Sequence, residues 1–219
     1  MKMKLTAILA AMSLIIGAQA QTITNVFQHN DNVVIPDANP TGYTSTNRIS
    51  GVSGGIQSVT VTLNTLNGYN GDLYAYLSYS DGFAVLLNRM GKNASNVYGS
   101  SSSGLSITLS DTATTDIHLA GDNGGSQLTG TWLPDGRETN PQNVVTSDPR
   151  TALLSSFDNL SPDGTWTLFV SDMASGYQTT LVSWTLTIVT TPEPTSLQLL
   201  IACGGLFALP AWRRLQAKR

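Results

Sequence analysis

Cysteine and charged residues are scarce in this sequence. The 219 residues include one cysteine, Cys203, and only 11% are Asp, Glu, Lys or Arg. A single cysteine excludes an intrachain disulfide framework and a cysteine-based zinc site. Between residues 21 and 191 there is one Lys and one Glu, whereas Thr and Ser are abundant. Because long straight side chains favour helices and β-branched ones favour strands, this composition disfavours a helical bundle or a doubly wound α/β fold.

Basic residues are also rare away from the two ends of the chain. Residues 21–191 contain 13 Asp and Glu against 5 Lys and Arg. A nucleic-acid-binding protein needs a basic surface to neutralise phosphates, so the sequence excludes nucleic acid as a partner. The length suits one domain with short appendages.

The N-terminus has the three parts of a secretory signal peptide. Residues 1–4 are basic, residues 5–18 are apolar, and Ala18-Gln19-Ala20 supplies small residues at the −3 and −1 positions. We therefore predict a helical signal peptide over residues 1–20. Signal peptidase is expected to cut after Ala20, which leaves Gln21 as the first residue of an exported chain.

The C-terminus also has three parts in a fixed order. Pro192-Glu193-Pro194 lies in a linker, residues 191–196; an apolar run, residues 197–212, and a cluster of arginines follow. As a helix, the run would span about 24 Å, less than the ~30 Å hydrocarbon core of a membrane. This arrangement resembles the PEP-CTERM sorting tail of Gram-negative bacteria. The resemblance implies that residues 197–219 anchor the protein transiently in the inner membrane, and that an exosortase removes them near the motif and delivers the protein to the cell envelope or outside.

Residues 21–190 are predicted to form one all-β domain. Apolar and polar residues alternate with period two, and clusters of Gly, Asp and Asn separate the alternating segments. This pattern predicts antiparallel strands in a β-sandwich or jelly roll. The predicted strands cover residues 59–64, 73–78, 105–109, 166–168 and 182–188.

Two segments of the middle lack this alternation. Asp148-Pro149 before residues 151–154 predicts a helical turn, because Asp and Pro favour the start of a helix. Residues 121–147 show little periodicity and are predicted to form a long loop.

Three motifs in the middle carry a family resemblance. Gly71-Asp72-Leu73 is followed by Asp163-Gly164-Thr165-Trp166 and by a final Trp184-Thr185-Leu186. In order and spacing they resemble the P/Homo B domain, the β-sandwich that follows the subtilisin-like catalytic domain of kexin- and furin-type proprotein convertases. The resemblance covers about residues 33–189. It implies an association with serine endopeptidases, although this length leaves no room for the catalytic domain.

Elementary physics assigns these motif residues structural roles. Trp166 and Trp184 are at inward-facing positions of their strands and are expected in the core. We expect Gly71 to occupy a turn that requires positive φ. Asp72 and Asp163 are expected to accept hydrogen bonds from backbone amides of their own turns.

One motif suggests catalysis. Gly51-Val52-Ser53-Gly54-Gly55 matches the G-x-S-x-G pattern of serine hydrolases, which requires a strand-to-helix elbow and a later acid and His. Here an alternating strand follows the motif, His29 precedes it, and His118 is the one later histidine. We therefore predict a glycine-rich turn, no catalytic residues and no enzyme activity.

Metal binding stays open. Asp111, Asp116, Asp122 and Asp172 lie in predicted loops, and calcium takes six to eight oxygen ligands in such places. The sequence lacks the D-x-D-x-D-G spacing of a dedicated calcium loop. A structural calcium is thus an alternative to a metal-free domain, and no other cofactor is expected.

These patterns favour an exported, non-catalytic binding or structural module at the bacterial envelope or matrix. One alternative is an accessory module that docks on a separate subtilisin-like protease. Another is a carbohydrate-binding jelly roll for the polysaccharide matrix, for which Tyr74, Tyr76 and Tyr79 are candidate contacts.

Overall fold

The structure, a computed structural model, describes residues 21–191. The predicted signal peptide and the predicted sorting tail, including Pro192, Glu193 and Pro194, lie outside the described residues. Within residues 21–191, no helix is long and apolar enough to cross a membrane.

The described chain consists almost entirely of strands and loops, which confirms the all-β prediction. Three short 3₁₀ helices interrupt it: η2 (Asn70–Asp72), η3 (Ile117–Leu119) and η4 (Leu154–Phe157). The strands are β1 (Ile23–Val34), β2 (Asn39–Ile49), β3 (Gly55–Asn67), β4 (Leu73–Tyr79), β5 (Gly82–Asn88), β6 (Leu105–Leu109), β7 (Leu128–Trp132), β8 (Gly164–Asp172) and β9 (Thr179–Thr191).

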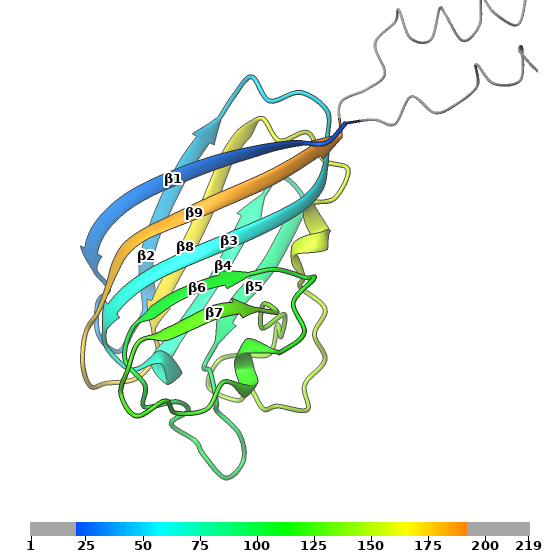
Figure 1. The fold of residues 1–219 in the computed structure, drawn as a ribbon. Coiled ribbons are helices and arrows are strands. Elements are labelled where there is room, and N and C mark those ends of the chain that lie inside the picture. The colour runs from blue at the N-terminus through cyan, green and yellow to red at the C-terminus, as the bar shows by residue number, and fades with distance from the viewer. Residues whose placement is uncertain (1–20, 192–219) are drawn as a thin grey trace, which may run out of the picture. The chain divides into compact units, whose positions relative to one another are not determined.

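The strands form two sheets (Figure 1). One has the order β1-β9-β3-β6-β7 and the other β2-β8-β4-β5. All five predicted strand segments lie within β3, β4, β6, β8 and β9. The prediction of purely antiparallel strands is wrong at one place, because β6 and β7 pair in parallel.

One hydrophobic core contains residues from both sheets. Trp166 on β8 and Trp184 on β9 are both fully buried. The indole nitrogen of Trp184 donates to Ser45 Oγ on β2 at 2.9 Å, which ties the two sheets together. Trp166 packs between Phe157 and Tyr79, with ring centroids 5.0 and 4.2 Å away.

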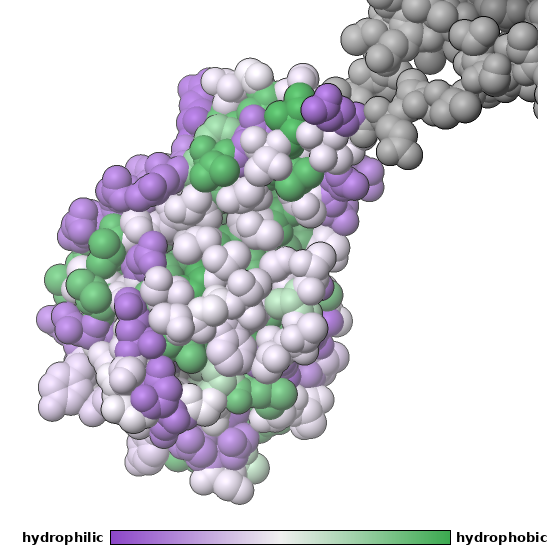
Figure 2. All heavy atoms as spheres, in the orientation of Figure 1, coloured by the Kyte–Doolittle hydropathy of each residue, from purple (hydrophilic) through white to green (hydrophobic). Residues whose placement is uncertain are grey.

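Polar side chains cover the outer face of the five-stranded sheet. Thr62 on β3 and Thr108 on β6 share a hydrogen bond of 2.9 Å there. The view over this sheet in Figure 2 is mainly pale, with scattered hydrophobic and hydrophilic residues. The period-two alternation of the sequence therefore separates an apolar inner face from a hydroxyl-rich outer one.

Two predictions about the irregular segments are wrong. Residues 121–147 include β7, which adds to the edge of the sheet beside β6. The expected helical turn at residues 151–154 is not helical before Leu154, because the amides of Thr151 and Ala152 both donate to the carbonyl of Gly136. The turn forms at η4 instead, where Asp111 Oδ2 accepts from the amide of Ser155 at 2.7 Å.

The ends of the described domain lie side by side. Ile23 at the start of β1 pairs with Thr190 near the end of β9. At the opposite end of β9, Thr179 pairs with Asn67 of β3, and η2 and the β8–β9 loop lie there (Figure 1). We call this opposite end the loop end.

Candidate functional site

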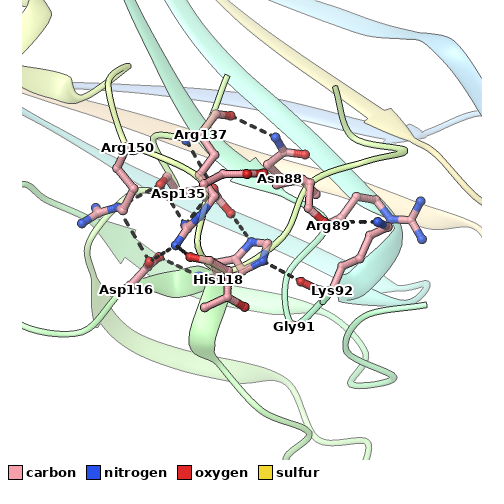
Figure 3. Close-up of polar contacts among 12 residues, drawn as sticks. Asn88, Arg89, Gly91, Lys92, Asp116, His118, Asp135, Arg137 and Arg150 are labelled. Carbon is pink, nitrogen blue, oxygen red and sulfur yellow. Dashed lines mark hydrogen bonds and ion pairs between the residues drawn. The ribbon is translucent and has the colours of Figure 1, made fainter. Parts of the chain in front are cut away.

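A buried polar cluster surrounds His118 in η3, and Figure 3 shows its contacts. His118 Nδ1 lies 2.8 Å from Asp135 Oδ2, and Nε2 lies 2.8 Å from the carbonyl oxygen of Lys92. The histidine is 1% exposed and Asp135 is fully buried. We call His118, Asp135, Arg137, Asp116 and Arg150 the histidine cluster.

Both ring nitrogens of His118 face acceptors. The Lys92 carbonyl can only accept, and so can an ionised Asp135 carboxylate, so this geometry suits the doubly protonated imidazolium. Burial alone would lower the pKa of His118, but the hydrogen bond and charge of Asp135 and the hydrogen bond to Lys92 raise it above its usual value. In this arrangement the ring has no free lone pair with which to accept a proton, as a general base must.

Arg137 pairs with both carboxylates of the histidine cluster. Its guanidinium lies 2.8 Å from Asp116 Oδ2 and 3.1 Å from Asp135 Oδ1. Burial alone would lower the pKa of Arg137, but Asp116 and Asp135 raise it. Arg150 reaches Asp116 at 3.7 Å and donates to the carbonyl of Asp135 at 2.9 Å. The carboxylates of Asp116 and Asp135 therefore share two guanidinium groups and the imidazole of His118.

This cluster fastens an irregular segment to the sheet. Asn88 at the end of β5 donates to the carbonyls of Arg137 and Thr139, both at 2.9 Å. Arg137 also donates to the carbonyl of Thr146 at 2.9 Å. Since residues 133–150 form no named strand or helix, side chains provide many of the hydrogen bonds that secondary structure would otherwise supply.

Ser53 lies in the loop between β2 and β3, and a strand rather than a helix follows it. Gly51 and Val52 donate their amides to the carboxylate of Asp163 at 2.7 and 2.9 Å, and β3 begins at Gly55. Asp163 therefore fixes a neighbouring turn and not its own, contrary to the prediction. His118, in contrast, is bonded to Asp135 and Lys92, so no contact between Ser53 and His118 is among the hydrogen bonds of either loop.

A second group of acids lies at the loop end. Asp72 Oδ1 is 3.5 Å from Arg89 Nη2, and both side chains are almost completely buried. Burial raises the pKa of Asp72 to about 6; Arg89 opposes this, and Asp172 and Asp37 add to it. Burial also raises the pKa of Asp172. The carboxylate of Asp72 thus pairs with a neighbouring side chain and not with its own turn, where it was expected.

Gly71 also differs from its prediction. It is absent from the described residues with positive φ, and a Cβ on it would lie 2.4 Å from the amide nitrogen of Ser100. Close approach of two backbones, and not a left-handed turn, requires glycine at this position.

The four calcium candidates have separate local partners. Residues 21–191 contain no group of three or more His, Cys, Asp or Glu side chains placed to hold a metal ion. A structural calcium stays a prediction without a defined ligand set. The nearest partners are the Ser155 amide for Asp111, Arg137 for Asp116, the Ser101 amide for Asp122 and the Ala174 amide for Asp172.

The strand tyrosines pack against one another. Tyr76 stacks on Phe169 with centroids 4.8 Å apart, and Tyr74 lies 6.0 Å from Tyr76. Tyr79 stacks on Trp166 and donates its hydroxyl to the carbonyl of Ser161 at 2.6 Å. Tyr74, Tyr76 and Tyr79 are half-buried, and a sugar contact at these residues stays a prediction.

The loop end has a hollow that sequence reasoning missed. It has a volume of about 450 Å³ and lies beside two tyrosines whose ring centroids are 5.3 Å apart. We call it the tyrosine hollow. It is lined by Asn67, Gly68, Tyr69, Ser103, Tyr177 and Gln178.

Comparison with known proteins yields structural similarity only. No family model matches the sequence, and no curated protein matches it. The crystal structure of the Aeromonas sobria serine protease in complex with the chaperone ORF2 is similar at a TM-score of 0.46 and 15% identity, over 84% of this chain and 29% of that chain. The crystal structure of the Aeromonas sobria serine protease has a TM-score of 0.44 and 14% identity, over 82% of this chain and 29% of that one. The chain thus spans less than a third of the length of these neighbours.

Proposed function

We propose that the chain is an exported, non-catalytic P/Homo B β-sandwich that acts as an accessory module for a subtilisin-like serine protease. The observation that carries the non-catalytic part is the saturation of His118 by Asp135 and Lys92. The P/Homo B motifs support the choice of partner: Trp166 and Trp184 lie in the core, and Asp72 and Asp163 fasten adjacent segments.

The accessory role is tested with the full chain and the subtilisin-like protease of its own host. We expect the two proteins to copurify, and we expect the protease to inactivate more slowly on heating when the chain is present. A protease whose recovery and thermal inactivation are the same with and without the chain would contradict this function.

The non-catalytic role needs its own assay. The full chain should show no peptidase or esterase turnover, and Ser53→Ala should leave that result unchanged. Turnover that Ser53→Ala abolishes would contradict the proposal, because it would require a nucleophile in this turn.

We further propose export to the envelope through the two ends of the chain. Signal peptidase would release Gln21, and an exosortase would cut near Pro192–Pro194 after residues 197–212 had halted in the inner membrane. Intact-mass measurement on envelope material is the test. A mature species that retains Cys203 and the terminal arginines would contradict sorting and would indicate a permanent anchor.

A further inference from the structure

The polar side chains of the tyrosine hollow are less engaged in hydrogen bonds than those of a second hollow in the domain. A second hollow of about 280 Å³ lies beside His118 and includes Asn93, Asn96 and Asp122 in its lining. Their polar atoms are already engaged with the chain: Asn93 Oδ1, for example, accepts from the amide of Asn96 at 2.9 Å. Such a lining has few hydrogen-bonding groups left for a ligand.

The side chains of the tyrosine hollow are free by comparison. Within residues 21–191, no hydrogen bond is found for the side-chain amides of Asn67 and Gln178 or for the hydroxyls of Tyr69 and Tyr177. Each amide offers both donors and an acceptor. The lining therefore combines aromatic rings with unengaged hydrogen-bonding groups and contains no charged side chain.

The backbone around the hollow is firmly held. The amide of Gly176 donates to Asp37 Oδ1 at 3.1 Å, and the amide of Met173 donates to the carbonyl of Asp72 at 2.8 Å. A Cβ on Gly176 would lie 3.2 Å from the ring of Tyr69, so the loop and the ring are closely packed. This packing holds Tyr69 in place, while Tyr177 remains 67% exposed.

We propose that the tyrosine hollow binds a neutral saccharide. Aromatic rings contact the apolar C–H faces of sugars, and side-chain amides and hydroxyls pair with sugar hydroxyls. An anionic or cationic ligand would find no opposite charge among the lining residues. The volume of about 450 Å³ lies within the usual range of small-ligand sites.

The hollow lies far along the domain from the paired ends of β1 and β9. It lies at the loop end, where β9 begins, whereas Ile23 of β1 pairs with Thr190 near the end of β9 (Figure 1). This inference goes beyond the accessory role and does not depend on a protease partner. It also moves the sugar contact from Tyr74, Tyr76 and Tyr79 to the loop-end tyrosines.

The test uses the full chain in a detergent without a sugar headgroup. Neutral oligosaccharides of glucose, mannose, xylose and N-acetylglucosamine are titrated by calorimetry up to about 10 mM, with polygalacturonate as a charged comparison. We expect at least one neutral probe to bind. Tyr177→Ala should weaken that binding by about tenfold or more, because it removes an aromatic contact surface.

Matched variants make the result specific to the hollow. Tyr98→Ala removes a tyrosine that is 78% exposed in another loop, and it should leave the affinity unchanged. Gln178→Ala keeps both rings and should cause a smaller loss than Tyr177→Ala. Three results would each overturn the proposal: no neutral probe binds, only the charged probe binds, or binding survives Tyr177→Ala. A protease bound through Tyr177 without any sugar binding would instead assign the hollow to a protein partner.

Discussion

The two-sheet core and the histidine cluster hold this domain together by different means. In the core, Trp184 and its neighbours are apolar and follow the period of the strands. In the cluster, Asp116, Asp135 and Arg137 are also buried, but they lie on segments without strand periodicity. A regular strand therefore needs only an apolar face to be buried, whereas a buried irregular segment needs specific polar partners.

The largest effect is expected in the core. Trp184→Ala should lower the free energy of unfolding by roughly 3–5 kcal/mol, because it leaves a cavity and also frees the hydroxyl of Ser45. Trp132→Ala, at the half-buried edge strand β7, is the control and should cost only about 1 kcal/mol. Denaturant unfolding measures both. A loss below about 1 kcal/mol for Trp184→Ala would mean that β9 has a different register.

The histidine cluster should be nearly as sensitive, for an electrostatic reason. Arg137→Met leaves the buried carboxylates of Asp116 and Asp135 with less compensation, and we expect a loss of about 3 kcal/mol. Arg48→Met removes an exposed arginine of β2 and should change stability by no more than about 0.5 kcal/mol. If the two variants were equally stable, the histidine cluster would not contribute to the stability of the fold.

The pH dependence of stability separates the two acid-containing regions further. Burial raises the pKa of Asp72 to about 6 in the folded state, against an ordinary value of 3.8, so the folded state holds the proton more tightly. The stabilisation of the folded state by protonated Asp72 is therefore complete below about pH 4 and is lost as the pH rises to about 6; it is on the order of 3 kcal/mol. His118 has a raised pKa, so its contribution is complete below about pH 6.5 and is lost at higher pH.

Unfolding midpoints measured from pH 4 to pH 9 test these two pH windows. Asp72→Asn should reduce the fall between pH 4 and 6, with a remainder from Asp172, whose pKa is also raised. His118→Gln should flatten only the fall above pH 6.5. A stability that rises with pH across both windows would contradict both assignments.

Much of the fold could be predicted because hydrophobic periodicity reports it directly. Where one face is apolar and the other carries hydroxyls, as in β3, β6 and β9, the sequence alternates and the strands were predicted. The strands β1, β2, β5 and β7 were missed. β1 places polar His29 and Asp31 at its half-buried positions, and nearly every residue of β5 is buried, so neither shows a clean apolar–polar alternation.

The polar sites could not be predicted, because they depend on contacts between distant residues. Asp135 lies 17 positions from His118, and the carboxylate of Asp163 reaches amides 111 and 112 positions away. No local spacing encodes such pairs. Asp116 beside His118 was the one available signal, and it was interpreted as a calcium candidate. Tyr69 and Tyr177 meet only because β3 and β9 pair, so the tyrosine hollow likewise follows from topology.

The smallest effect is expected on the outer face of β3. Thr62 and Leu63 are neighbours on β3, but Thr62 bonds Thr108 on the outer face and Leu63 is 1% exposed in the core. Thr62→Val removes a partly solvated hydrogen bond and supplies another β-branched residue, so stability should change by no more than about 0.5 kcal/mol. Leu63→Ala should cost about 2–5 kcal/mol, because it creates a buried cavity. Since a shift of one residue exchanges the two faces of a strand, a large loss for Thr62→Val with a small one for Leu63→Ala would show that β3 presents the opposite face to the core.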